Sequence, residues 1–277
     1  MLPAGYMLLA CPEREGGFCE AKDGRVIGAS LLPPTLRQIY RRGGHWPSGT
    51  YTFRIKNIRG LNRPLFDLRD IMITFMTEAV SKIGTDKKTA CRFMGCGKGP
   101  LSEALEELYE ECLELYMQTA DLKAVYRKTS VSFGVDNEVI FDFGSVKSES
   151  LRKNLEGCKS AYVFAATVGA EVDRTMKRLS LISEADAMVY SCIASSGIEC
   201  WCDYINAEMA KEHTLKPRFS PGYGGVSLEI QRNIFDFLDV QRKIGVSLTD
   251  SLMMVPVKSV TAIVGIVGAP IGRPSSK

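Results

Sequence analysis

Residues 102–119 carry the strongest structural signal in this chain of 277 residues. Their apolar side chains recur at steps of three and four residues, at Leu105, Leu108, Cys112, Leu115 and Tyr116. That spacing is typical of an α-helix with one buried face, and acidic residues fill the opposite face. We therefore predict a long amphipathic helix over this segment.

Further helices and strands are predicted in a mixed order along the chain. Helices are predicted over 86–93, 170–179, 185–212 and 227–239. A further helix is predicted to be capped by Ser148 and to carry Leu151 and Leu155. The predicted strands are Ala124–Phe133, Val139–Phe143, Ala161–Thr167 and Lys258–Val267. Because these elements do not follow a strict βαβ rhythm, we predict an α+β fold with mixed helices around a mainly antiparallel, twisted sheet.

The first part of the chain differs from the rest in composition. Residues 1–71 hold six of the 12 prolines and nine of the 25 glycines, and eleven basic residues against six acidic ones. We predict that residues 1–75 form a basic, Gly/Pro-rich extension that is poorly ordered. A domain over 76–270 and a short tail over 271–277 follow it. The one short alternating run in the extension is Tyr51–Ile55.

Two other interpretations of this extension stay open. The stretch Arg37–Arg42 mixes cations with the ring of Tyr40, a combination that can hold phosphate and stack on nucleic-acid bases. Alternatively, translation begins at Met72 or Met76. We expect nucleic acid not to be a partner, because no known fold or repeat surrounds the basic stretch.

Several classes of protein are disfavoured by the composition. No window approaches 18 consecutive apolar residues, and the N-terminus lacks the pattern of a secretory signal, so neither a membrane partner nor export is predicted. The nine cysteines form no C-x-x-C pair, and there are two histidines. We predict reduced thiols in a cytoplasmic protein and no metal site; a zinc or iron–sulfur site is the less favoured alternative.

The glycine-rich run Gly95–Gly99 looks like the nucleotide loop of a Rossmann fold. Such a loop follows an apolar strand, whereas the residues before it, 85–92, are too charged for a buried central strand. It is not a P-loop either, because Gly99 stands after Lys98 where a hydroxyl residue is required. We predict a turn between two helices.

A second turn-rich segment, 217–225, has the chemistry of a ligand-binding loop. Two prolines and three glycines exclude regular structure there, and helices are predicted on both sides. Arg218 offers a planar fork of donors that matches a carboxylate. Gly222 and its neighbouring glycines allow a ligand to approach the backbone, and Tyr223 supplies a flat face with a hydroxyl.

Several segments occur in the order and spacing of one known family. The Arg-x-x-x-Gly-Tyr pattern of 218–223 is followed by 249–256, which is similar to Thr-Glu-Ser-x-x-Met-x-Pro, and then by a Ser-Val strand from Ser259. Two upstream landmarks are Ala165–Gly169 and Arg92–Gly95. With these segments, residues 86–268 resemble the activation domain of cobalamin (vitamin B12)-dependent methionine synthase. The resemblance implies that family's fold.

The sequence departs from the family pattern at three points. Gly224 follows the tyrosine where the family commonly has proline, and Asp250 replaces the usual glutamate. The Asp-x-His-x-x-Gly signature of a cobalamin-binding module is absent, and the remaining length holds no homocysteine or folate domain. The chain therefore resembles a stand-alone activation domain.

The resemblance implies a function that needs other proteins. S-adenosylmethionine would be bound for the reductive methylation of cob(II)alamin, with the cobalamin supplied by a methionine synthase subunit or another corrinoid protein and the electron by a flavodoxin-like donor. The chain would be part of a methyltransferase system of methionine biosynthesis. A docking module for a corrinoid protein, without a productive S-adenosylmethionine site, is the alternative.

The resemblance also implies roles for individual residues. Arg218 would bind the methionine carboxylate of the ligand, and Ser220, Gly222 and Tyr223 would contact the remainder. Two acids of the preceding helix, Glu199 and Glu212, would meet the ligand amine or ribose, and Asp250, Ser251 and Lys258 would line the site. Structural alternatives stay open: a salt bridge for Arg218, packing for Tyr223, and a solvated surface for the two glutamates.

Overall fold

The computed structural model describes residues 73–96 and 100–268, and also the backbone of five short strands nearer the N-terminus. Those strands are β1 Met7–Leu8, β2 Phe18–Ala21, β3 Val26–Gly28, β4 Gly49–Phe53 and β5 Ile55–Lys56. The alternating run at 51–55 falls on β4 and β5. The predicted disorder of the extension, the basic stretch 37–42 and the tail 271–277 otherwise lie outside the described residues.

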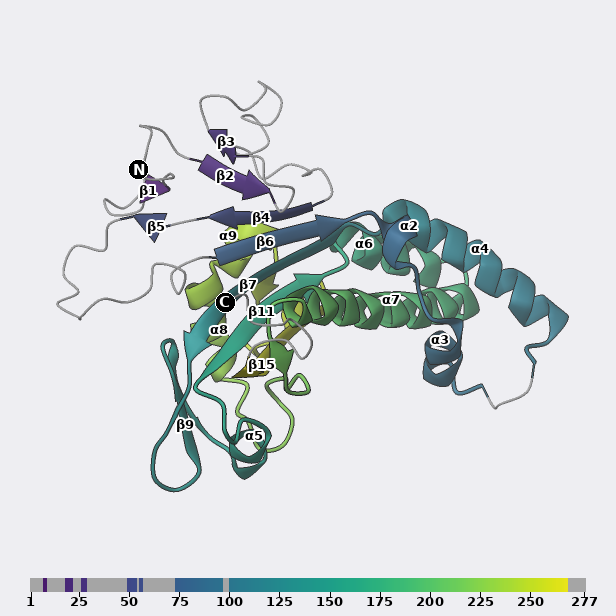
Figure 1. Ribbon diagram of the computed structural model, residues 1–277. Helices are drawn as coiled ribbons and strands as arrows, with labels where there is room; N and C mark the ends of the chain where they lie inside the picture. The colour runs from purple at the N-terminus through teal and green to yellow at the C-terminus, as the bar shows by residue number, and fades with distance from the viewer. Residues whose placement is uncertain are drawn as a thin grey trace.

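One large antiparallel sheet organises the molecule. Its strand order is β12-β15-β11-β7-β6-β4-β2-β3, and every neighbouring pair is antiparallel. Its remaining strands are β6 Ile73–Glu78, β7 Leu122–Ser130, β11 Ser160–Thr167, β12 Thr214–Leu215 and β15 Ser259–Gly268. The long strands β7, β11 and β15 lie side by side in this sheet, and helices lie on both of its faces (Figure 1).

The central strands are buried on both faces, and alternate side chains serve two separate cores. On β11, Ala161, Val163 and Ala165 belong to one core. Tyr162 and Phe164 belong to the other. A strand covered on both sides reads as a continuous apolar run, which explains why the segment 161–167 carries little polar alternation.

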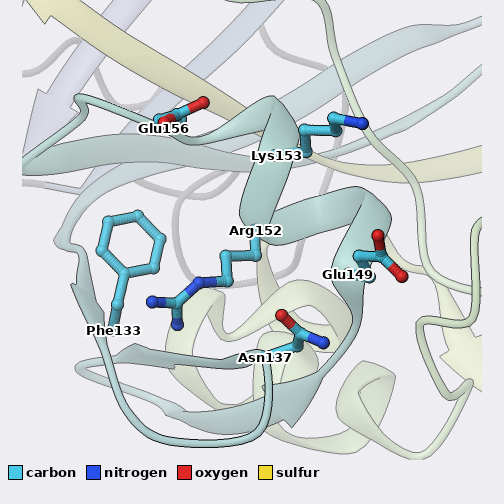
Figure 2. A pocket seen from close by; sticks show the side chains of 6 residues that line it. All are labelled: Phe133, Asn137, Glu149, Arg152, Lys153 and Glu156. Carbon is cyan, nitrogen blue, oxygen red and sulfur yellow. The ribbon is translucent and has the colours of Figure 1, made fainter.

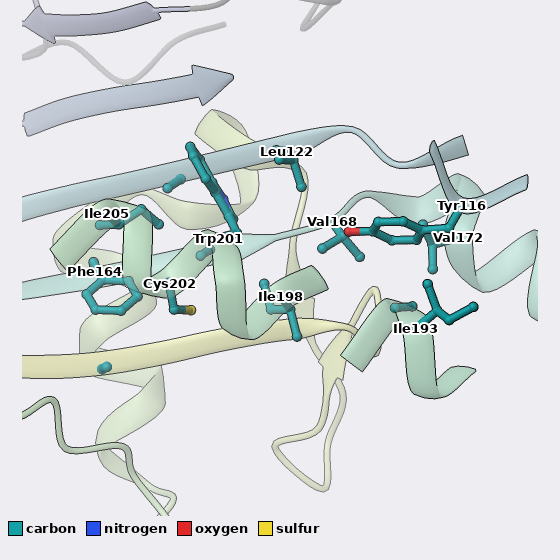
Figure 3. Packing of buried hydrophobic residues seen from close by; sticks show 14 of the residues in the cluster. Tyr116, Leu122, Phe164, Val168, Val172, Ile193, Ile198, Trp201, Cys202 and Ile205 are labelled. Carbon is teal, nitrogen blue, oxygen red and sulfur yellow. The ribbon is translucent and has the colours of Figure 1, made fainter. Parts of the chain in front are cut away.

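Helices cover the first face. They are α2 Val80–Ile83, α3 Lys87–Phe93, α4 Glu103–Thr119, α6 Ala170–Ser180 and α7 Glu184–Ala210. Within this layer α7 packs against α3, α4 and α6 as well as against the sheet, so it is buried on most sides. Trp201 of α7 is fully buried there and donates from Nε1 to the carbonyl of Lys123 at 3.1 Å (Figure 3).

The second face is covered by shorter elements. They are α5 Glu149–Asn154, α8 Ile230–Leu238, α9 Val240–Ile244, the small sheet of β8 Ser132–Phe133, β9 Glu138–Phe141 and β10 Gly144–Lys147, and the hairpin of β13 Ser247–Leu248 and β14 Met254–Val255. Ile234 and Leu238 of α8 pack here with Val163 of β11. The α+β class and the mainly antiparallel sheet are confirmed.

Most of the predicted elements are present with shifted ends. Ser148 caps α5 as predicted, because its hydroxyl accepts from the N–H of Leu151 at 3.1 Å. The prediction of one strand over 124–133 was wrong. The chain leaves the large sheet after Ser130, whose N–H donates to Asp142 at 2.8 Å, and continues in the small sheet as β8.

Two further predictions differ from the structure. The helix predicted over 227–239 begins only at Ile230, because Ser227 accepts from the N–H of Glu229 at 3.2 Å and holds a turn there. The segment around Met76, one of the two alternative starts of translation, is the buried strand β6. The predicted domain boundary between residues 75 and 76 falls inside that strand.

Candidate functional site

The 218–223 loop begins on the edge of the large sheet. After β12, Lys216 donates its N–H to the carbonyl of Gly265 at 2.8 Å, and Phe219 exchanges two backbone bonds of 2.8 Å with Ile263. The extended pairing with β15 fixes the path of the chain up to Phe219, whose ring packs into the core of the second face. Since neighbouring side chains of an extended chain alternate, Arg218 points to the opposite side, toward α7.

Arg218 forms two ion pairs with acids of α7. One guanidinium nitrogen donates to Asp203 at 2.6 Å and another donates to Glu199. The arginine is 23% exposed, whereas the carboxylates are 43% exposed at Glu199 and 73% at Asp203. Burial disfavours its charge, but the Cys202 thiol and the two carboxylates outweigh burial and raise the pKa of Arg218.

A polar stripe on α7 continues from these acids. Ser191, Ser195, Glu199 and Asp203 are spaced by four residues, so they lie on one side of the helix. Lys258 donates to Ser191 at 3.0 Å and to Ser195 at 2.7 Å. Burial lowers the pKa of the Lys258 ammonium. Two cations thus lie against one helix side, with Lys258 on the two serines and Arg218 on the two acids that follow them along the helix.

The second half of the loop is a glycine turn. Gly222 donates to Val226 at 2.8 Å and Val226 donates to Tyr223 at 2.9 Å, while Ser220 accepts from Tyr223 at 3.3 Å. Gly222 and Gly224 have φ of 89° and 53°, a region that favours glycine. The Tyr223 side chain is 73% exposed at the tip. The loop therefore presents an exposed ring on a backbone that is fixed at both ends.

Gly224 leaves no space for a side chain. A Cβ atom there would lie 2.6 Å from the ring of Phe219 and 2.8 Å from Ser150 of α5, and the Gly224 carbonyl accepts from Ser148 at 2.7 Å. The family-typical proline is thus replaced by a residue that lets α5 approach the turn.

Gly224→Ala is expected to distort this turn, because a left-handed conformation and two close contacts both oppose a methyl group. We expect a loss of about 1–3 kcal/mol in the free energy of unfolding, measured by urea denaturation. Gly225→Ala is the matched control, since its φ is also positive and its Cβ would meet nothing within 4 Å. An equal loss in both variants would contradict the packing argument.

The structure brings some of the predicted residues together and not others. Arg218 and Glu199 are in contact. Glu212 is exposed just beyond the end of α7 and lies near Tyr162. Burial raises the pKa of the Tyr162 hydroxyl, and the negative charge of Glu212 raises it further. Because 214–219 runs extended along β15, Glu212 is separated from Arg218 by roughly 20 Å of extended chain.

Asp250 and Ser251 lie at the exposed tip of the β13–β14 hairpin. The Ser251 hydroxyl shares a 3.0 Å hydrogen bond with Thr249 of the same turn. Within residues 73–96 and 100–268, no hydrogen bond or ion pair joins either residue to the 218–223 loop. Sequence reasoning missed Asp203 and the two serines, although their four-residue spacing with Glu199 is a signal that identifies one side of a helix.

A shallow hollow of about 300 Å³ lies elsewhere, beside α5 and the β8–β9 hairpin (Figure 2). Its lining residues are Phe133, Asn137, Glu149, Arg152, Lys153 and Glu156. Arg152 donates to the carbonyl of Gly134 at 2.9 Å and lies 5.0 Å from the centre of the Phe133 ring. Arg152 thus holds the hairpin against α5. Helix α5 in turn packs against the turn at Gly224.

Among the described residues, no three His, Cys, Asp or Glu side chains gather in a way that holds a metal ion. In the same part of the chain, no helix has the length and apolar character needed to cross a membrane.

Comparisons with known proteins agree with the resemblance. The profile of the family described as vitamin B12 dependent methionine synthase, activation domain, matches residues 197–268. That stretch contains the acids of α7, the 218–223 loop, the β13–β14 hairpin and β15. A search of curated proteins finds no match.

A solved structure extends the likeness beyond that stretch. The fold is similar to the crystal structure of the MetH reactivation domain bound to AdoHcy, with a TM-score of 0.54 and 15% sequence identity. The likeness covers 74% of this chain and 80% of that chain. At this identity the likeness establishes the fold. Together with the family match over residues 197–268, it bears out the resemblance to the activation domain of vitamin B12-dependent methionine synthase.

Proposed function

We propose that this chain binds S-adenosylmethionine at the Arg218–Tyr223 loop and acts on a cobalamin held by a partner protein. The observation that carries the proposal is the pairing of Arg218 with Glu199 and Asp203 at the rim of a fixed glycine turn. One cation and two acids offer partners for the carboxylate and the ammonium of an amino-acid ligand, which supports the proposal. The likeness to a domain solved with AdoHcy supports the same ligand class.

The ion pairs suit the exchange of one partner for another. The α-carboxylate of the ligand replaces a protein carboxylate on the guanidinium fork of Arg218, and the α-ammonium takes the acid that is released. Both acids are partly exposed, so burial opposes the release of either one to the ligand ammonium only weakly. The number of ion pairs is conserved in this exchange, which keeps its cost low.

The remaining part of the loop offers contacts for the rest of the ligand. The exposed ring of Tyr223 provides a flat apolar face, and Gly222 beside it is exposed and carries no side chain. When bound, S-adenosylmethionine supplies an electrophilic methyl group. This chain contributes positioning by holding the sulfonium end over the partner's corrin face, since orientation supplies much of the rate gain in such transfers.

We propose that the chain works as a separate activation component in the cytoplasm. The partner is a cobalamin-binding methionine synthase subunit or another corrinoid protein, and a flavodoxin-like protein supplies the electron. To test this, the full chain is mixed with a cob(II)alamin-loaded methionine synthase fragment that lacks its own activation domain, with reduced flavodoxin and S-adenosylmethionine. Conversion to methylcobalamin in the visible spectrum is expected only with the chain present.

Calorimetric titration of the full chain with S-adenosylmethionine tests the binding step alone. We expect one ligand per chain, and competition by S-adenosylhomocysteine. An absence of binding under conditions where the protein is folded would leave the docking-module function, in which the chain binds the corrinoid protein without this ligand. The Arg218–Tyr223 loop would then not be an S-adenosylmethionine site.

Glu199→Gln is expected to weaken binding of S-adenosylmethionine by roughly 3- to 10-fold, because a charged partner of the ligand ammonium becomes a neutral one. The measurement is the same titration. Glu184→Gln, at the exposed start of α7, is the matched control and is expected to leave affinity unchanged. Equal affinities of Glu199→Gln and the wild type would remove Glu199 from the site.

A further inference from the structure

Helix α3 ends in a hydrogen-bonded cap that joins two cysteines. The N–H of Cys96 donates to the carbonyl of Cys91 at 3.0 Å, and the N–H of Gly95 donates to Arg92 at 3.2 Å. Gly95 has φ of 74°, the left-handed conformation of the residue just past a helix end. These two bonds and the glycine define a Schellman motif.

This motif brings the side chains of its first and last residues together. The residue three positions before the cap and the residue two positions after it usually make an apolar contact. Here those two positions are Cys91 and Cys96. Because a 3.0 Å backbone bond joins the two residues, their Cα atoms fall within the range of about 4.4–6.8 Å that a disulfide spans.

Both thiols are free and partly exposed, whereas most of the other described cysteines are not accessible. Cys112, Cys158, Cys192 and Cys202 are buried. Cys200 and Cys202 are two residues apart on α7, so the helix directs them to different sides and they cannot pair. Of the seven cysteines described, Cys91 and Cys96 are the two that a backbone motif holds side by side.

We propose that Cys91 and Cys96 form a reversible intramolecular disulfide by exchange with a low-molecular-weight disulfide such as glutathione disulfide. The Cys96 thiolate attacks one sulfur of glutathione disulfide, forms a mixed disulfide and releases one glutathione thiolate. The Cys91 thiolate then attacks the Cys96 sulfur and expels the second. Two protein thiols are oxidised by two electrons, one glutathione disulfide is reduced to two thiols, and the two protons pass to them.

The order of the two steps follows from the surroundings of Cys91. Burial raises the pKa of the Cys91 thiol, so its thiolate is less available for the first attack. In the second step the mixed disulfide on Cys96 is already beside Cys91, and the helix cap gives the Cys91 thiol a high effective concentration at that disulfide. The product protects two accessible thiols from oxidation beyond the reversible stage. This proposal does not depend on the proposed binding of S-adenosylmethionine.

Peptide mapping tests the proposal directly. The full-length chain is equilibrated with glutathione disulfide, its remaining thiols are alkylated after denaturation, and the protein is digested with trypsin. Cleavage after Arg92 and Lys98 places the two cysteines on separate peptides, 89–92 and 93–98. We expect these peptides to be joined by a disulfide that dithiothreitol reverses. Recovery of both peptides separately, each alkylated or glutathionylated, would overturn the proposal.

Gly95→Ala tests whether the cap is responsible. Its Cβ would meet nothing within 4 Å, so the effect of the methyl group is confined to the strained left-handed conformation. We expect the disulfide to form with an effective concentration lower by about tenfold, measured against defined ratios of glutathione and its disulfide. Cys91→Ser is the matched control, and there Cys96 is expected to stop at the mixed disulfide. Unchanged closure in Gly95→Ala would overturn the role of the cap.

Discussion

Alanine in place of Arg218 is expected to lower the affinity for S-adenosylmethionine by about 30- to 1,000-fold, a loss of about 2–4 kcal/mol. The variant removes the cation that receives the ligand carboxylate and leaves Glu199 and Asp203 unneutralised beside it. Their negative charge then repels the carboxylate as well. Calorimetric titration of the variant and the wild type under the same buffer conditions measures the difference.

Arg218→Lys is the informative control for this prediction. It keeps the positive charge but replaces the planar fork by a single ammonium, so we expect affinity between those of the wild type and the alanine variant. Both acids are substantially exposed, so we expect the alanine variant to stay folded. If the alanine variant binds as tightly as the wild type, Arg218 is a structural ion pair and the ligand site lies elsewhere.

Trp201→Ala is expected to reduce the free energy of unfolding by about 3–5 kcal/mol, the usual cost of removing a large buried aromatic side chain. Trp201 is 0% exposed, its ring stacks on Tyr204 at 5.7 Å between centres, and its Nε1–H satisfies the carbonyl of Lys123. The substitution leaves a cavity between α7 and the sheet and an unpaired carbonyl. Urea denaturation followed by circular dichroism measures the loss.

Trp201→Phe separates the two contributions. It keeps most of the packing and removes the donor, so we expect a loss nearer 1–3 kcal/mol. Because α7 also carries Glu199 and Asp203, the alanine variant is expected to bind S-adenosylmethionine more weakly even where it remains folded. A loss below about 1 kcal/mol for Trp201→Ala would show that α7 is not anchored through this residue.

The sequence alone was sufficient for the fold class because the long elements have strong periodicity. The helix over 102–119 and the apolar strand over 161–167 each appear within two residues of the predicted ends. β6 was missed because residues 73–78 read as an isolated apolar stretch beside a Gly/Pro-rich segment. Both of its partners in the sheet, β4 and β7, are distant in sequence, β7 by more than forty residues, and such pairing leaves no local signal.

The candidate site was predictable only in part for a related reason. The glycines and Arg218 mark the loop locally, whereas the pairing of Arg218 with α7 depends on the register of 216–219 on β15. That register makes Glu199 a neighbour and places Glu212 at a distance, although Glu212 is closer in sequence. Spacing along the chain is therefore a poor guide to proximity when an extended segment intervenes.

The glycine run 95–99 illustrates the opposite case. Gly95 ends α3 in a helix cap and α4 begins at Glu103, so the described part of the run connects two helices, as predicted. Residues 97–99 lie outside the described residues. The backbone need for a left-handed residue explains Gly95 without any nucleotide.

Hydrogen–deuterium exchange with and without S-adenosylmethionine tests the central claim most directly, because it locates the ligand without any substitution. We predict slower exchange in the segment 218–226 and in the part of α7 around Glu199 and Asp203, with little change in the glycine run at 95–100. Protection concentrated at 95–100, or no change in 218–226 at saturating ligand, would contradict the assignment of the site to the Arg218–Tyr223 loop.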